Sequence, residues 1–208
     1  MAPAQPMQAD LPREENAGGG RSPTLETLVL IVVVFVAQQL VGMISQALAA
    51  GLFVLGPPIS ARPWTLLASV YAHASVPHLV SNAIVLVVVG FAVESVTTKW
   101  RFHAFFVTVG MLAGLAQVVV SGLVGPGSAV LGASGAVFGL VGYLLAGNPL
   151  TEAVLGWLPL GSRAKVAILL AFAVAVTMAT AAPGVALVAH FTGFVLGSVA
   201  GRAKLLDV

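Results

Sequence analysis

The chain has 208 residues, of which 59% are hydrophobic and only 8% charged, and its mean hydropathy is +1.04. Because a soluble domain carries about 25% charged residues, this composition excludes an ordinary soluble protein and predicts a chain embedded in lipid. The net charge of +2 is too small to indicate a nucleic-acid partner, and the absence of cysteine excludes disulfides, thiolate metal sites and a cysteine nucleophile.

The first segment, residues 1–23, is polar and rich in proline and glycine. It lacks the apolar centre of a cleavable signal peptide, and it is too short for a folded cytosolic domain. We therefore expect a disordered cytoplasmic tail. The remainder, residues 24–208, is expected to form one all-α membrane domain that contains the functional site.

Six hydrophobic segments follow the tail, each close to the roughly 17–25 residues needed to cross a bilayer. Residues 50–75, between the first two, are of mixed polarity and contain Trp64 and three prolines, so we expect them to lie in the interface. The boundary between the last two segments rests on Pro183-Gly184. The expected spans are residues 25–49, 76–95, 102–124, 129–146, 166–182 and 185–202.

The basic residues predict the orientation of these spans. An even number of spans places both termini on one side of the membrane. Eight of the nine Lys and Arg residues then lie on that side, and only Arg62 lies on the other. The positive-inside rule makes the basic side cytoplasmic. We therefore predict a multi-pass cell-membrane protein with cytoplasmic termini, whose second, fourth and sixth spans begin at the outer face.

Four polar residues lie at a similar depth in this arrangement. His78 and Asn82 are near the start of the second span, Ser134 is about five residues into the fourth, and His190 is about five residues into the sixth. At 1.5 Å per residue, all four lie within roughly 3–10 Å of the outer boundary. Polar groups inside a membrane usually face a protein interior or a water-filled cavity. A serine and a histidine at one depth indicate a nucleophile and its base.

The spacing within the second and fourth spans supports a common site. His78 and Asn82 are four residues apart, so they share one helix face, and both can donate hydrogen bonds. Ser134 and Phe138 have the same spacing on the fourth span. The glycine-rich loop at residues 125–128 leaves Ser134 near a helix N-terminus, where free N–H groups favour developing negative charge.

The sixth span has a face of small residues beside its histidine. His190, Gly193 and Gly197 share this face, and Gly193 and Gly197 form the small-xxx-small pattern that lets helix backbones approach closely. We expect the sixth span to approach the fourth there, which would bring His190 within reach of Ser134.

These residues carry a family resemblance that covers all six hydrophobic segments. The chain resembles a rhomboid intramembrane serine protease. Gly90 and Glu94 also match a structural pattern at the end of the second span. The motifs that carry the resemblance are His73-xxxx-His78-xxx-Asn82, Gly132-Ala133-Ser134-Gly135 and Ala189-His190-xx-Gly193-xxx-Gly197.

The resemblance implies a six-transmembrane-helix bundle that cleaves transmembrane protein substrates near the outer face. It implies a Ser134–His190 dyad, with the oxyanion stabilised by His78, Asn82 and the Ser134 backbone N–H. Gly132, Gly135 and Phe138 are then supporting residues, and we expect His73 to order the loop and water access.

The chain departs from the family pattern at two places. Many members carry Trp-Arg in the first outer loop, where this chain has Trp64-Thr65. Many also carry Tyr where Phe138 stands. Phenylalanine keeps a surface on which the imidazole can stack but lacks the hydroxyl, and we expect this change to be compatible with activity.

The acidic residues bear on the mechanism. All seven lie in tails or toward the cytoplasmic ends of spans, and none is expected near His190, so a Ser-His-Asp triad is disfavoured. We expect His190 to be held by packing against Phe138 instead. It would take the Ser134 proton during attack and return it to the leaving amine.

Three alternatives to the protease hypothesis are a metal site, a transporter and an inactive member of the family. A metal site made from His73, His78 and His190 is disfavoured because no carboxylate or thiolate completes it, and we expect no cofactor. A small transporter would show paired halves with broken helices, which we do not find. A catalytically inactive rhomboid-like protein that binds membrane clients would keep the fold and lose the dyad. The sequence leaves the oligomeric state open.

Overall fold

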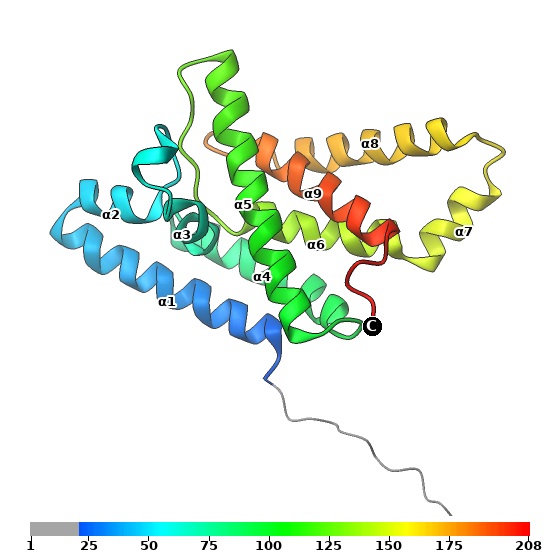
Figure 1. The fold of residues 1–208 in the computed structure, drawn as a ribbon, viewed down its shortest axis with the longest axis horizontal. Coiled ribbons are helices and arrows are strands. Elements are labelled where there is room, and N and C mark those ends of the chain that lie inside the picture. Colours follow the sequence, from blue (N-terminus) through cyan, green and yellow to red (C-terminus); the bar gives the residue numbers. More distant parts are fainter. Residues whose placement is uncertain (1–20) are drawn as a thin grey trace, which may run out of the picture.

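The computed structural model describes residues 21–208, which are helical apart from turns, loops and one isolated β-bridge (Figure 1). The expected disordered tail falls almost wholly outside the described residues, and Pro23 already begins the first helix. The helices are α1 (Pro23–Ile44), α2 (Gln46–Phe53), η1 (Ile59–Ala61), α3 (Thr65–Tyr71), α4 (Val76–Glu94), α5 (Lys99–Val124), α6 (Ser134–Gly147), α7 (Pro149–Trp157), α8 (Ser162–Ala179) and α9 (Leu187–Arg202).

The last five expected spans each correspond to one helix, whereas the first, residues 25–49, breaks at Ser45 into α1 and the start of α2. Helices α1, α4, α5 and α8 are long and apolar enough to cross a membrane. Helices α6 and α9 have only 14 and 16 residues, fewer than the roughly 17–25 that a full crossing requires. The bundle therefore combines four full-length helices with two shorter ones, and the two shorter ones carry Ser134 and His190.

The start of α6 corrects the expected fourth span. We predicted a helix over 129–146 with Ser134 about five residues inside it, but Ser134 is the first helical residue. The preceding chain makes other backbone bonds: Val130 exchanges N–H···O bonds of 2.7 and 3.0 Å with Leu55, and the Gly132 N–H donates to Ser69 O at 2.8 Å. Non-helical backbone is tolerated at membrane depth only where protein or a water-filled cavity satisfies it, and these bonds supply that.

Short helices occupy the segment that was expected to lie in the interface. Helix α2 begins after a break at Ser45, whose hydroxyl accepts the Leu48 N–H, and α3 lies beside α5. Helix α7 was not anticipated. It connects the ends of α6 and α8 away from the rest of the bundle (Figure 1) and has a proline at its first position, where the missing N–H costs no hydrogen bond.

The turn between α8 and α9 follows from its sequence. Val185 N–H donates to Ala182 O at 3.1 Å, and Gly184 has φ +82°. Proline followed by a glycine with positive φ is the sequence of a type II turn. This turn makes α8 and α9 antiparallel neighbours (Figure 1), as the Pro183-Gly184 boundary predicted.

Helices α6 and α9 are in direct backbone contact. A Cβ placed on Gly193 would lie 2.0 Å from Gly135 O, and one placed on Gly197 would lie 1.9 Å from Gly139 O. No side chain fits at either position, so the structure shows the close approach that the glycine spacing predicts. The apolar core lies beside this pair, with Ile31, Leu86, Phe102, Phe106, Val137 and Leu140 among its members.

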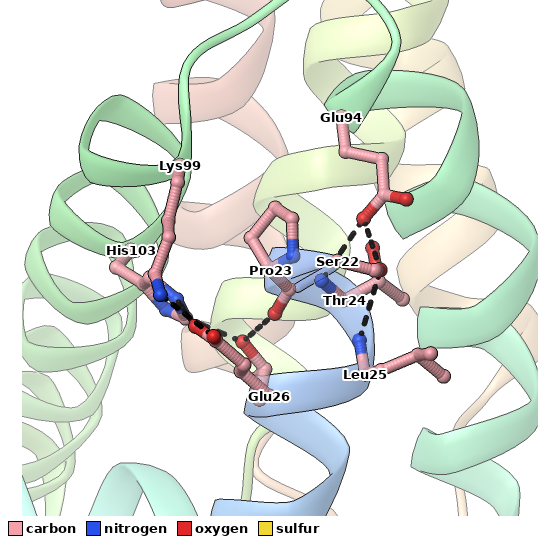
Figure 2. A network of polar contacts seen from close by, with 9 residues as sticks. Ser22, Pro23, Thr24, Leu25, Glu26, Glu94, Lys99 and His103 are labelled. Carbon is pink, nitrogen blue, oxygen red and sulfur yellow. Dashed lines mark hydrogen bonds and ion pairs between the residues drawn. The ribbon is translucent and has the colours of Figure 1, made fainter. Parts of the chain in front are cut away.

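Polar contacts fix the beginning of α1 to α4 and α5 (Figure 2). Glu26 accepts from Lys99 Nζ at 2.6 Å and lies 3.0 Å from His103 Nε2, while Glu94 accepts from Ser22 Oγ at 2.6 Å. These residues lie where α1 begins, α4 ends and α5 begins. They therefore occupy the end of the bundle opposite the starts of α4, α6 and α9.

Candidate active site

Ser134 lies at the N-terminus of α6, directly after a tight backbone turn. Gly132 has φ +133°, a conformation that L side chains rarely adopt, and Ala133 occupies the N-cap position without a capping side chain. The first N–H groups of a helix have no partner within it. Ser134 therefore lies beside backbone N–H groups that have no partner within the helix and at the positive end of the helix dipole.

His190 is held on α9 beside the start of α6. Its ring stacks on Phe138 with a centroid separation of 4.3 Å and an interplanar angle of 16°, and only 7% of the residue is exposed. A Cβ on Gly135, the residue after Ser134, would lie 3.7 Å from Ala189 O, and Gly193 contacts Gly135 directly. The residues flanking Ser134 and His190 thus touch one another.

The side-chain hydrogen bond of His190 goes to a residue that we did not expect. His190 Nδ1 lies 3.0 Å from Thr180 Oγ1, and among the side-chain hydrogen bonds of residues 21–208 none joins His190 to Ser134. Hydrogen bonds between catalytic groups are often long in the free enzyme and tighten when substrate binds. The contact between α6 and α9 places Ser134 and His190 on adjacent helices, and the described side-chain hydrogen bonds do not join them.

His78 lies against the turn that precedes Ser134. A Cβ on Gly132 would be 2.7 Å from His78 Cε1 and 2.9 Å from Nε2, so the imidazole covers that glycine. Asn82 is one turn further along α4 and is 6% exposed, and its Nδ2 donates to His78 O at 2.9 Å. The structure therefore brings the His78 ring to the serine loop and buries Asn82 behind it.

His73 lies in the loop between α3 and α4 and is completely buried. Its Nδ1 donates to Tyr71 O at 3.1 Å, its backbone N–H donates to Gln38 Oε1 at 3.1 Å, and its ring meets that of His78 edge-on at 5.0 Å. Burial, and then the charge of His78, lower the pKa of His73 to about 4. The residue is therefore neutral at physiological pH. Its contacts suit the loop-ordering role that we expected.

Gln117 is a polar residue of the site that the sequence analysis missed. From α5, its Oε1 accepts the Ala189 N–H at 3.2 Å and its Nε2 donates to Ser128 Oγ at 3.1 Å. It thus joins the start of α9 to the loop before α6. The sequence signal that could have identified Gln117 is an uncharged amide within an otherwise apolar span.

A small cavity lies beside Ser134. Its volume is about 10 Å³, close to the smallest space that holds one water molecule. The cavity thus leaves room for about one water molecule next to the serine. The lining includes Ser69, Gly110, Gly132, Ser134, Gly135 and Ala189.

The loop between η1 and α3 uses a different anchor from the Trp-Arg pair of the family pattern. Trp64 Nε1 donates to Gly51 O at 3.3 Å, which ties the loop to α2. Thr65 Oγ1 donates to Arg62 O at 2.6 Å and so stays within the turn. The tryptophan, rather than a basic residue after it, therefore connects this loop to the bundle.

The described carboxylate contacts lie at the other end of the molecule. Glu94 is 16 residues beyond His78 on α4, which corresponds to about 24 Å along the helix. Asp207, after α9, accepts from the Tyr143 hydroxyl. Among the residues whose side chains the structure describes, no group of three or more potential metal ligands comes together.

Comparison with known proteins adds to this geometry. The family model described as Rhomboid domain matches residues 60–206, a range that contains every site residue above. The chain belongs to the rhomboid family. With its long apolar helices, it is a multi-pass membrane protein with the all-α rhomboid-like bundle.

Several relatives show the same similarity. RHOMBOID-like protein 4 of Arabidopsis thaliana is 30% identical over 147 residues, which cover 69% of this chain and 34% of the relative. RHOMBOID-like protein 2 of the same plant is 32% identical over 69% of this chain and 43% of its own length. Rhomboid protease GluP of Bacillus subtilis is 37% identical over 82 residues, 39% of this chain and 15% of the relative. The matched part is thus less than half of each relative.

Proposed function

We propose that this rhomboid is an intramembrane serine endopeptidase, with Ser134 as nucleophile and His190 as its base. The observation that carries the proposal is the backbone contact of Gly135 with Gly193, which sets the helix of Ser134 against the helix of His190. Phe138 fixes the plane of the imidazole by stacking. One of the relatives is named as a rhomboid protease, which is consistent with this chemistry.

In this mechanism Ser134 Oγ attacks the scissile carbonyl while His190 takes the hydroxyl proton. The imidazolium then gives that proton to the leaving amine. Water, activated by the same imidazole, releases the acyl-enzyme and restores the serine hydroxyl. The acyl-enzyme thus divides one difficult step into two easier steps, as in other covalent hydrolases.

The negative oxygen of the tetrahedral intermediate requires donors that are already in place. The free N–H groups at the start of α6 supply backbone donors, and we assign His78 and Asn82 as side-chain donors. One preorganised donor of this kind contributes about 2.7–4 kcal/mol to catalysis. The contact of His78 with Gly132 supports its assignment, since it places the ring beside the serine turn.

The proposed substrates are transmembrane segments of membrane proteins, cleaved near the outer face of the cell membrane. The basic residues favour cytoplasmic termini, with the starts of α4, α6 and α9 toward the outside. The site then lies below the outer surface, at the level where α6 and α9 begin.

The test is Ser134→Ala in purified protein reconstituted into lipid vesicles. We expect cleavage of a model transmembrane substrate and labelling by a fluorophosphonate to be lost together, because the nucleophile is removed. His190→Ala should also abolish both, since an unactivated hydroxyl is a weak nucleophile at neutral pH. His78→Ala and Asn82→Ala should leave partial activity, because each removes one donor of several.

Thermal unfolding of Ser134→Ala serves as the control, and we expect it to match that of the original protein. Cleavage by Ser134→Ala at the original rate would overturn the assignment of the nucleophile. An original protein that neither labels nor cleaves would favour a rhomboid-like protein that binds membrane clients without cutting them.

A further inference from the structure

The imidazole of His190 has two nitrogens, and the mechanism requires each to have a definite state. A general base must present a lone pair to the serine hydroxyl, so the other nitrogen must carry the hydrogen. In Ser-His-Asp enzymes a carboxylate selects this tautomer by accepting from Nδ1. The described carboxylate contacts of this chain lie at the opposite end of the bundle, so another acceptor is needed here.

Thr180 lies at the C-cap of α8 and occupies the position of that acceptor. Its Oγ1 is 3.0 Å from His190 Nδ1 and 2.8 Å from Thr177 O. A carbonyl oxygen can only accept, so the 2.8 Å contact uses the single hydrogen of the Thr180 hydroxyl. The hydroxyl oxygen is then left to accept from Nδ1–H.

The opposite arrangement is unfavourable. If Thr180 donated to Nδ1, its oxygen would stand 2.8 Å from Thr177 O with no hydrogen between two electronegative atoms. A hydroxyl that donates to a carbonyl in the preceding turn is a common local bond in helices, and here it sets the direction of the next bond. The Thr177 carbonyl therefore orients the Thr180 hydroxyl, which in turn orients His190.

We propose that Thr180 is the third member of this site: its hydroxyl oxygen accepts from His190 Nδ1–H and so holds Nε2 as the lone-pair nitrogen that faces Ser134. Thr180 is a positioning residue and does not touch substrate. Phe138 supplies a flat surface on one face of the ring but no polar group, so the stack fixes the ring plane and Thr180 fixes the tautomer. This inference rests on the proposed protease function.

The consequence for catalysis is moderate and specific. Loss of a neutral hydrogen bond of this kind corresponds to a fall of about two- to tenfold in rate. The loss should appear in kcat and in the rate of fluorophosphonate labelling, with KM little changed, because substrate binding does not involve Thr180.

The test compares Thr180→Val with Thr180→Ser in reconstituted full-length protein. Valine keeps the shape and removes the hydroxyl, so we expect a fall of about two- to tenfold in kcat and labelling rate. Serine keeps the hydroxyl and should retain most of the activity. Ser198→Ala is the matched control, because Ser198 is a buried hydroxyl on α9 with no hydrogen-bond partner among the described residues, and its loss should leave the rate unchanged.

A second readout does not depend on activity. Nitrogen-15 NMR of histidine-labelled protein should show His190 with its hydrogen on Nδ1, and Thr180→Val should shift the tautomer toward Nε2–H. His78 is a titratable group that interacts electrostatically with His190, so the two histidines affect each other's spectra. A spectrum of His78→Gln therefore serves to assign the His190 signals.

The outcomes separate this inference from the function on which it rests. Equal rates for Thr180→Val and the original protein, or an Nε2–H tautomer in the original protein, would overturn the role of Thr180 while Ser134→Ala still abolishes cleavage. Equal losses for the valine and serine variants would overturn it too, because shape rather than the hydroxyl would then matter. Failure of the original protein to label would instead count against the protease itself.

Discussion

At the scale of single residues, the site depends on a glycine as much as on its polar groups. Gly132 meets two separate requirements: its φ of +133° and the His78 ring that occupies the space where a Cβ would be. The same residue donates its N–H to Ser69 O and so shapes the turn before Ser134. The backbone geometry here determines where both the proposed nucleophile, Ser134, and the proposed oxyanion donor, His78, lie.

We therefore expect Gly132→Ala to reduce activity strongly. The strained backbone costs about 1–3 kcal/mol, and the new methyl group would displace the His78 ring. Thermal unfolding and the rate of substrate cleavage are the two measurements. Gly122→Ala is the matched control, because a Cβ at Gly122 meets nothing within 4 Å and alanine favours a helix. A fully active and equally stable Gly132→Ala would contradict this account of the turn.

At the scale of helices, α6 and α9 form a fixed pair, while α8 is attached more lightly. Glycines on both helices let the α6 and α9 backbones touch along their length. Helix α8 has only Ala173 and Thr177 buried, four residues apart, and packs mainly against α9. Ser134 and His190 thus stand on the most tightly joined helices of the bundle.

Gly197→Leu tests this pairing. The added side chain has no space, since even its Cβ would lie 1.9 Å from Gly139 O, so α9 must move outward and carry His190 with it. A displacement of about 1 Å at a catalytic group can cost roughly a hundredfold in rate. We expect membrane insertion to persist and cleavage to fall by that order, as measured by fractionation and a substrate assay.

Val199→Leu provides the comparison on the same helix. Val199 is 62% exposed, so a larger side chain there extends into lipid and should leave cleavage intact. If Gly197→Leu cleaved as fast as Val199→Leu, the glycine contact would not determine the geometry of the dyad.

At the scale of the whole molecule, polar groups gather at two opposite ends. Ion pairs and carboxylates lie where α1 and α5 begin and α4 ends (Figure 2), whereas serine and histidine lie where α4, α6 and α9 begin. The first set fixes the helices to one another with groups that suit a membrane surface. The second set contains the residues that we propose as nucleophile, base and oxyanion donors.

The position of the proposed site at one end of the bundle predicts where substrates are cut. A protease needs an extended backbone at the scissile bond, so we expect cleavage near the outer end of a substrate span, in a region of small or helix-destabilising residues. Mass spectrometry of the product termini identifies the bond. The control substrate carries the same destabilising residues at its cytoplasmic end and should remain intact. Cleavage at that end would show that the assigned topology is wrong.

Much of this organisation could be predicted from the sequence, because hydrophobic length and glycine spacing are local signals. The six helical segments, the Pro183-Gly184 turn and the contact of α9 with α6 follow from them. The start of α6 did not, because the non-helical residues before Ser134 are satisfied by bonds to Leu55 and Ser69, far away in the chain.

The partners of His190 show the same division between local and distant information. Stacking on Phe138 was expected from the family pattern, and the structure contains it. Thr180 was missed, because its partner is on the next helix and only the turn between α8 and α9 shows that it faces the imidazole. Gln117 was missed for a similar reason, since its partners lie on two other segments.

The contact between α6 and α9 also limits which amino-acid substitutions this protein can tolerate. Main-chain atoms have no rotamers and are the same in every residue type, so the spacing of the two helices does not depend on how any side chain relaxes. Every substitution at Gly193 or Gly197 adds side-chain atoms where the main chain of α6 leaves no room for them. The distance between the helices of the proposed nucleophile and base is therefore set by main-chain contacts, and a substitution at either glycine can only increase it.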